Sequence, residues 1–340
     1  MTTQTSTPPS TATVSIPVKR TPTPVRLLES FALPLLAIVV FAFFSFFPLS
    51  SASFPTMNNI NVILGSQAVV ALIAIAALFP LVCGYFDFSL GAVAIMTQVM
   101  TAGLMSVFGL PLWLSIVVSL VLGTLVGVVN GFFVTRLNMS PFVTTLGMSM
   151  LLAGLMSWFT GGQTFVSGID PALIKFGSTR LLGIPVVFFI TLLIAAIAWY
   201  FFTHTPFGRS LYAIGSNATA AKLVGLPVTK NVWWSFIVAG FIAGCAGVLQ
   251  LSRVGSASAI DGGSLLFPAL AAVFLGATAI RPGFFNVIGT IVGAIFVSVS
   301  VSGLALSGAS GWASNVFNGA ALLAAVGLST YLGRRKRTGS

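Results

Sequence analysis

The sequence predicts an all-α, polytopic membrane protein with about ten transmembrane helices and with both its N- and C-termini in the cytoplasm. The first observation is composition: 57% of the 340 residues are hydrophobic, only 6% are charged, and the mean hydropathy is +1.07. A soluble domain carries about a quarter charged residues, so a water-soluble core does not account for this chain. The second observation is length, because apolar runs of about 20 residues, enough to cross a bilayer core of about 30 Å, recur along the sequence.

Three regions follow one another along the chain. Residues 1–26 are rich in Thr, Pro and Ser and are predicted to form a disordered cytoplasmic tail. Residues 27–333 are predicted to form the transmembrane domain, and residues 334–340 a basic cytoplasmic tail. The predicted spans are Phe31–Phe47, Asn61–Leu78, Leu90–Phe108, Leu112–Thr135, Pro141–Thr160, Ile184–Thr203, Asn231–Leu251, Ser264–Ile280, Phe285–Leu306 and Trp312–Leu332.

Basic residues support this count, because cytoplasmic segments of membrane proteins carry an excess of Lys and Arg. With the N-terminus in the cytoplasm and ten crossings, all but three of the 15 Lys and Arg residues fall in cytoplasmic segments. The three outer ones are Lys175, Arg180 and Arg253. Nine or eleven spans would place either the leading or the trailing basic residues outside.

Glycines four residues apart predict close packing of several spans. Such spacing places the glycines on one helix face, where two backbones can approach closely without a hydrophobic drive from lipid. The repeats are Gly123-x3-Gly127-x3-Gly131, Gly240-x3-Gly244 and Gly289-x3-Gly293.

The polar stretch from His204 to Lys230 is the longest interruption between two apolar runs. Within it, Asn217–Leu223 begins with a good N-cap residue and continues with small helix formers, which predicts a short surface helix. Gly225 and the following Pro227 are expected to end that helix. A short polar helix between spans suits contact with a protein outside the membrane.

Several classes of function are disfavoured by what the sequence lacks. It contains no GxxxxGK[ST] phosphate loop, so no ATPase site is expected on this chain. His204 is the single histidine, the cysteines Cys83 and Cys245 sit in apolar surroundings, and no metal-ligand spacing occurs. The formal charge of +11 is scattered between spans rather than gathered on one face, which argues against a nucleic-acid partner.

The acidic residues argue against a proton-coupled secondary carrier. There are only four, and a proton relay requires ionisable groups inside the spans. They are Glu29, Asp87, Asp170 and Asp261. Sodium coupling through backbone carbonyls remains open.

Two sets of polar residues have two interpretations each. Asp87, Ser89 and Gly91 lie where a helix breaks and restarts, so Asp87 is either the N-cap of the third span or a pathway or gating residue. Asn130, Thr144 and Thr145 lie within spans, where they either face a passage for a neutral polyol or hydrogen-bond a neighbouring helix. The same holds for Gln98, Gln250 and Asn318.

Four segments between about Asn61 and Gly319 follow one family pattern in order. LVCGYFDFSLGAV follows GxxDLSVG, VNGFFVTRLNMSPFVTTLG follows NGxxVxxxxxxPFIxTLG, GRSLYAIGSNATAAKLVGLPV follows GRxxYAIGGNxxAAxxSGI, and AGCAGVLQLSRVGSA follows AGxAGxxxxxRxxSA. Together they resemble the ribose-type (sugar) ABC transporter permeases, the inner-membrane subunits of binding-protein-dependent importers.

The resemblance implies a multi-pass subunit of the bacterial inner membrane, surrounded by lipid. It pairs with a second permease as a homodimer or heterodimer, receives solute from an extracytoplasmic binding protein, and is driven by separate cytoplasmic ABC ATPase subunits that bind the ATP. No cofactor is then expected on this chain. The resemblance also implies a coupling helix in contact with the ATPase, whose matching residues are Gly208, Arg209, Gly215, Asn217, Ala220, Ala221 and Gly225.

The chain departs from the family pattern near its third quarter. Leu266 stands where the family commonly has an acidic residue, Pro268 follows two positions later, and Pro282 replaces a glycine of a GGxG turn. The resemblance favours import of a small neutral solute, with a monosaccharide first. The alternatives are a related permease for a nucleoside or a branched-chain amino acid, and a stand-alone secondary carrier.

Overall fold

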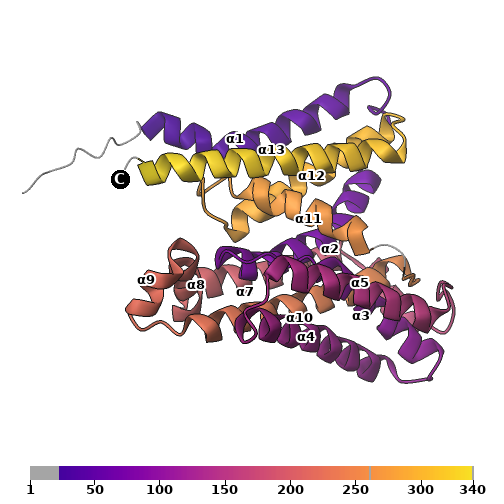
Figure 1. The fold of residues 1–340 in the computed structure, drawn as a ribbon. Coiled ribbons are helices and arrows are strands. Elements are labelled where there is room, and N and C mark those ends of the chain that lie inside the picture. Colours follow the sequence, from indigo (N-terminus) through magenta and orange to yellow (C-terminus); the bar gives the residue numbers. More distant parts are fainter. Residues whose placement is uncertain (1–22, 260–261, 339–340) are drawn as a thin grey trace, which may run out of the picture.

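The structure, a computed structural model, describes residues 23–259 and 262–338, almost all of them in helices (Figure 1). Most of the predicted N-terminal tail, residues 1–22, and Asp261 lie outside the described residues. The elements are α1 Thr23–Phe46, α2 Met57–Val82, α3 Leu90–Ser106, α4 Leu112–Thr135, α5 Pro141–Thr160, α6 Pro171–Ser178, β1 Arg180–Leu181, β2 Ile184–Pro185, α7 Val186–His204, α8 Pro206–Ser216, α9 Ala218–Leu223, α10 Val228–Val254, α11 Gly262–Gly276, α12 Val287–Leu306 and α13 Gly311–Thr338. The two strands form one short antiparallel hairpin.

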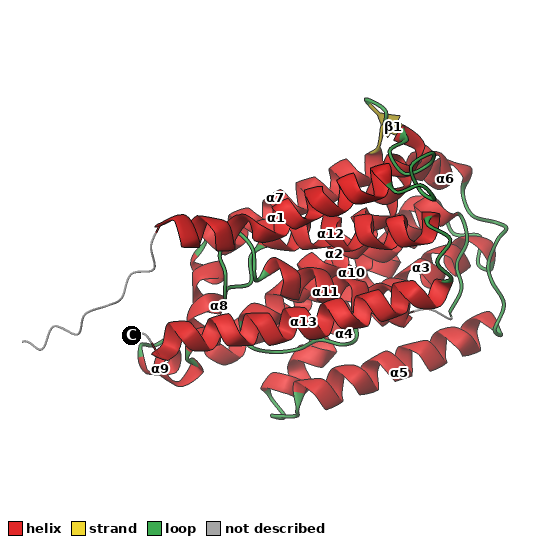
Figure 2. Ribbon diagram, turned by 90° about the horizontal axis from the view of Figure 1, so that it is seen from above, coloured by secondary structure: helices red, strands yellow, loops and turns green. Residues whose placement is uncertain are grey.

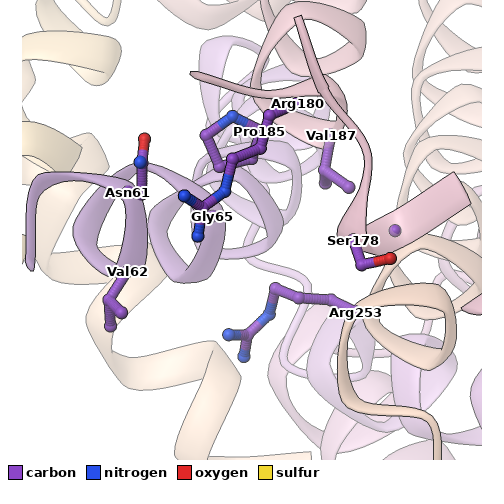
Figure 3. A pocket seen from close by; sticks show the side chains of 9 residues that line it. Asn61, Val62, Gly65, Ser178, Arg180, Pro185, Val187 and Arg253 are labelled. Carbon is purple, nitrogen blue, oxygen red and sulfur yellow. The ribbon is translucent and has the colours of Figure 1, made fainter. Parts of the chain in front are cut away.

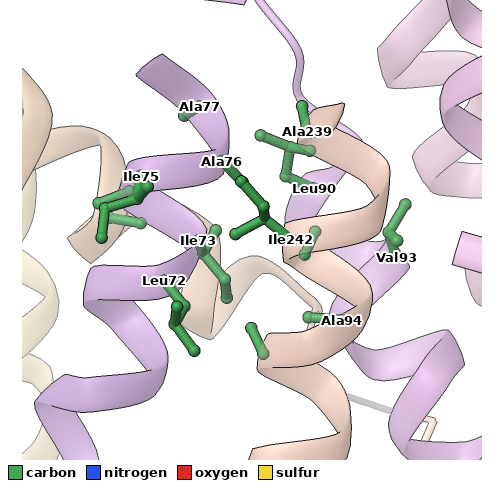
Figure 4. Packing of buried hydrophobic residues seen from close by; sticks show 14 of the residues in the cluster. Leu72, Ile73, Ile75, Ala76, Ala77, Leu90, Val93, Ala94, Ala239 and Ile242 are labelled. Carbon is green, nitrogen blue, oxygen red and sulfur yellow. The ribbon is translucent and has the colours of Figure 1, made fainter. Parts of the chain in front are cut away.

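Helix α2 lies between two groups of helices. On one side are α1, α11, α12 and α13, and on the other are α3, α4, α5, α7 and α10 (Figure 1). Nearly every residue of α2 from Ala68 to Val82 is buried, as expected for a helix that is apolar all round. Leu72 and Ile73 pack with Leu90 of α3 and Ile242 of α10 in the main core (Figure 4).

The glycine repeats lie where the structure brings helices closest together. A Cβ added to Gly123 of α4 would lie 3.1 Å from the carbonyl oxygen of Gly240 in α10, and one on Gly127 would overlap the carbonyl oxygen of Phe236. In the other group, a Cβ on Gly289 of α12 would overlap the backbone of α11. The prediction of close packing at these repeats is confirmed.

Each of the ten predicted spans overlaps a helix, and α4 and α5 have the predicted bounds. Among the described residues, six helices are long and apolar enough to cross a membrane, namely α2, α4, α5, α7, α10 and α12. Shorter apolar helices cover Ser30–Phe46, Leu90–Ser106 and Ser264–Gly276. Two boundaries differ from the prediction: α1 begins at Thr23, inside the predicted tail, and α13 continues through the basic segment to Thr338.

The two ends of the bundle carry different elements. The start of α1, the end of α13 and the α8–α9 pair lie at one end, and α6 and the β1–β2 hairpin lie at the opposite end (Figure 2). The connections between spans therefore separate by end, with the polar stretch from His204 to Lys230 on the side of both described chain ends.

Candidate functional site

Helix α8 is clamped against the ends of two long helices. Its first turn is capped by Thr205, whose Oγ1 accepts a hydrogen bond from Gly208 N–H at 3.2 Å. A Cβ on Gly208 would overlap the carbonyl oxygen of Phe201 in α7, and one on Gly215 would overlap that of Val82 in α2. Both positions therefore require glycine, and they explain why these two family residues stand where they do.

Two further hydrogen bonds hold α8 to later parts of the chain. Tyr212 Oη donates to the carbonyl oxygen of Phe285 at 2.7 Å, and Asn231 Nδ2 donates to Ser210 Oγ at 2.8 Å. Burial raises the pKa of Tyr212, with the positive charge of Arg281 offsetting part of the rise, so the hydroxyl stays a donor at neutral pH. The turn in which Pro282 departs from the family pattern is thereby tied to α8.

The predicted short helix is present as α9, and the prediction is confirmed. Asn217 is its N-cap, with Oδ1 accepting from Ala220 N–H at 2.9 Å. Gly225 follows the helix with a φ of +86°, a conformation that favours glycine. The helix is therefore fixed at both ends, which gives a small surface element a defined shape.

The faces of α9 differ from the expectation at one residue. Ala220 is exposed, as is Arg209 on α8, but Ala221 is only 4% exposed and belongs to the main core. Ala221 thus supports α9 from beneath, and the assignment of its side chain to a partner contact is wrong. Leu223 and Val224, which the sequence analysis passed over, are 84% and 77% exposed at the tip of α9.

A second set of predicted residues comes together at the start of α3. Asp87 Oδ1 accepts hydrogen bonds from Ser89 N–H at 2.9 Å and from Ser89 Oγ at 2.6 Å. Asn130 Nδ2 of α4 donates to Ser89 Oγ at 2.8 Å, and Phe88 N–H donates to Thr145 Oγ1 of α5 at 3.0 Å. We call Asp87, Ser89, Asn130, Thr144 and Thr145 the Asp87 cluster; it joins three helices that are far apart in sequence.

The Asp87 cluster is closed in this conformation. All five side chains are buried, as is Gly91 in the first turn of α3. The N-cap of α3 is Ser89, so the interpretation of Asp87 as the N-cap is corrected by two residues: its carboxylate closes the turn before the helix. Burial raises the pKa of this loop carboxyl to about 6, against the lowering effect of the Ser89 hydrogen bonds.

Two oxygens in the cluster have no hydrogen-bond partner among the described residues. They are Asn130 Oδ1 and Thr144 Oγ1, both buried. Buried polar atoms are nearly always paired, so these two mark a place where the packing differs in another state or accepts a polar guest. Gln98, in contrast, donates to the carbonyl oxygen of Ser256 at 2.8 Å and acts as an interhelical link.

A polar pocket of about 400 Å³ lies between α2, α12 and α13, beside Pro268 of α11. Its polar side chains carry no formal charge: Asn59, Ser66, Gln67, Ser298, Ser302 and Asn318. Gln67 Nε2 and Asn318 Oδ1 are buried without a partner, which leaves one free donor and one free acceptor in the lining. The serines at alternate positions of α12 were the sequence signal for this pocket, but only the fold shows that they meet Gln67.

Comparison with known proteins gives consistent relatives. The chain is 34% identical over 286 residues to the ribose import permease protein RbsC of Haemophilus influenzae, covering 83% of this chain and 88% of that one. It is 33% identical over 275 residues to RbsC of Bacillus subtilis, covering 81% and 85%. The D-allose transport system permease protein AlsC of Escherichia coli is 28% identical over 300 residues, covering 88% and 91%.

The fold also has a solved counterpart. A structure described as an inward-facing conformation of a metal-chelate type ABC transporter superposes with a TM-score of 0.54 at 16% identity. It covers 90% of this chain and 99% of that chain, so nearly the whole fold is shared. Residues 59–326 match the family described as branched-chain amino acid transport system / permease component, and this chain belongs to that family.

Proposed function

We propose that this protein is the membrane-spanning permease subunit of an ATP-binding cassette importer of the bacterial inner membrane, and that its solute is a monosaccharide. The observation that carries the proposal is the match to permeases over most of the chain, together with a surface element, α8–α9, fixed to the ends of long apolar helices. ATP hydrolysis belongs to separate cytoplasmic subunits, and solute reaches the permease from an extracytoplasmic binding protein.

The full topology is ten spans with both ends in the cytoplasm. The ten helices that overlap the predicted spans support this count, and so does the position of the start of α1 and the end of α13 at the same end of the bundle (Figure 2). The end that carries α8–α9 then faces the cytoplasm, and the end that carries α6 and the hairpin faces outward.

The tip of α9 is the contact for the ATPase. Leu223 and Val224 are almost fully exposed beyond the end of α10's neighbouring spans, in a polar segment, and exposed apolar groups of this kind typically mark a protein contact. α8 connects this tip to α2 and α7, and Tyr212 connects it to the turn before α12. A movement of the tip is thereby passed to both groups of helices.

The neutral polar pocket suits a polyhydroxylated solute. A sugar hydroxyl both donates and accepts, so it can pair with Gln67 Nε2 and with Asn318 Oδ1 in turn. The lining offers no charge to bind the carboxylate and ammonium of an amino acid. Gln67→Leu is expected to reduce uptake, because it removes the free donor while keeping the side-chain volume similar.

The test is uptake by reconstituted vesicles. The permease is co-purified with the ATPase and binding protein encoded with it, and entry of radiolabelled ribose is measured with ATP, with a non-hydrolysable analogue, and with a proton or sodium gradient alone. Uptake that requires hydrolysable ATP and all three components is expected. Uptake by the permease alone under an ion gradient would instead identify a secondary carrier.

The same vesicles separate the cargo alternatives. Allose, adenosine and leucine are added as unlabelled competitors of ribose. Competition by sugars is expected, and ATP-dependent entry of leucine or adenosine without sugar entry would replace the monosaccharide with the other cargo class.

A further inference from the structure

A pocket of about 220 Å³ lies at the end of the bundle opposite α9 and is lined by two arginines. Arg180 comes from the β1–β2 hairpin and Arg253 from the last turn of α10, and both side chains enter the same space beside α2 (Figure 3). The Arg253 side chain passes close to α2, with Cδ 3.7 Å from where a Cβ on Gly65 would stand. We call this site the arginine pocket; Asn61 and Ser178 add polar groups to its lining.

The arginine pocket carries positive charge that the described protein does not neutralise. Arg253 Nη2 donates to Gln250 Oε1 at 3.4 Å, and within residues 23–259 and 262–338 no carboxylate pairs with either guanidinium. Asp170, the acidic residue at this end, instead caps α6 by accepting from Ala172 N–H at 2.8 Å. Guanidinium groups bind phosphate in a bidentate manner, so the pocket is complementary to a phosphate or a similar anion.

An apolar groove begins beside the arginine pocket and runs further along the same helices. It lies between α2, α7 and α12, and its exposed lining is entirely apolar. On α2, Val62 lines the pocket while Leu64 and Ala68 line the groove, and on α7 Val187 lines the pocket while Phe188 lines the groove. Leu192 and Ile295, both more than a third exposed, form its open rim.

The dimensions of the two sites suit one molecule with a charged head and an apolar chain. Asn61 and Val187 lie within the first turns of their helices, at the depth of the headgroup region if these helices span the bilayer. Ala71, the deepest α2 residue of the groove, lies ten residues beyond Asn61, or about 15 Å along the helix. That distance places the groove alongside the acyl chains of the same leaflet.

We propose that the arginine pocket and the apolar groove together bind one phospholipid with an anionic headgroup. The phosphate pairs with Arg180 and Arg253, and one acyl chain lies in the groove between α2, α7 and α12. The topology proposed above makes this an outer-leaflet lipid, but binding itself does not depend on transport. A basic pocket between transmembrane helices is a recognised site for anionic headgroups.

The test is native mass spectrometry of the purified permease titrated with phosphatidylglycerol. The double variant Arg180→Gln/Arg253→Gln is expected to bind about thirtyfold more weakly, from about 1 kcal/mol per basic residue near an anionic headgroup. Lys175→Gln is the matched control, because Lys175 is an exposed basic residue of α6 that does not line the pocket. It is expected to bind as the unchanged protein does.

Two further probes separate a lipid from a small anion or a protein partner. Glycerol phosphate and inorganic phosphate carry the anion without the chain and are expected to bind far more weakly, and Leu192→Trp is expected to weaken phosphatidylglycerol by closing the groove. Equal binding of glycerol phosphate and phosphatidylglycerol would overturn the lipid assignment. So would a double variant that keeps its lipid but no longer associates with the binding protein, or loss of lipid to the same extent in Lys175→Gln.

Discussion

Replacement of Gly127 by alanine tests the packing of α4 on α10. The added Cβ would overlap the carbonyl oxygen of Phe236 and lie 3.0 Å from Ile237 Cα, whereas ordinary contacts begin at 3.4 Å. Both neighbours are backbone, so the helices must separate by at least about 0.4 Å along the seam. Overpacking of this kind costs about 1–3 kcal/mol. Alanine also raises helix propensity by up to about 1 kcal/mol, which obscures a single measurement.

Gly154→Ala provides the control, because Gly154 of α5 has no neighbouring atom within 4 Å of the added Cβ. Both variants gain the same helix propensity, so their difference isolates the overpacking. Thermal unfolding in detergent is expected to give a midpoint for Gly127→Ala several degrees below that of Gly154→Ala. Equal midpoints would mean that the α4–α10 seam can relax freely and that the glycine repeat does not govern it.

Three further predictions address other parts of the account. Asp87→Asn keeps an acceptor for the hydrogen bonds and cannot ionise; since the raised pKa makes the native protein lose up to about 3 kcal/mol as pH rises from about 4 through 6, the variant is expected to lack that loss when unfolding is followed against pH, and identical profiles would contradict the assigned burial. Tyr212→Phe leaves the Phe285 carbonyl without its donor and is expected to lower stability by about 1 kcal/mol in thermal unfolding, whereas an unchanged midpoint would show that α8 is held otherwise. With both native cysteines replaced, a cysteine at Ser216 is expected to react with impermeant maleimide only from the cytoplasmic side and one at Ser178 only from outside, and reversed labelling would refute the topology.

The sequence alone predicted the elements whose signals are local. Pro141 at the first position of α5 and Gly161 in a left-handed conformation after it mark both ends of that helix, and its predicted bounds agree with the structure. The cap of α9 by Asn217 was equally predictable, since capping depends on residues within one turn. The C-terminal end of α13 was not, because Arg and Lys are good helix formers and a basic run gives no stop signal.

Properties that depend on neighbours far away in sequence could not be predicted. A helix of six residues is too short for its periodicity to reveal its buried face, so Ala221 was assigned to the wrong side. The Asp87 cluster shows the opposite case: each residue was a candidate by type, but their hydrogen bonds across three helices required the fold. The polar pocket likewise depends on how α2 meets α12 and α13.

The central claim is that the tip of α9 is where the ATPase drives the permease, and loss of that contact can be measured directly. The double variant Leu223→Glu/Val224→Glu replaces two exposed apolar side chains whose burial in an interface contributes about 1.5–3 kcal/mol each. Leu182→Glu is the matched control, because Leu182 is 88% exposed at the tip of the hairpin on the opposite end.

The measurement is the affinity of purified ATPase for each permease variant in nanodiscs, without binding protein, with thermal unfolding as the control for folding. The account predicts that the α9 double variant binds the ATPase at least about a hundredfold more weakly, which corresponds to about 3 kcal/mol. Leu182→Glu is predicted to bind it as the unchanged permease does. Unchanged ATPase affinity in a correctly folded α9 variant would contradict the central claim.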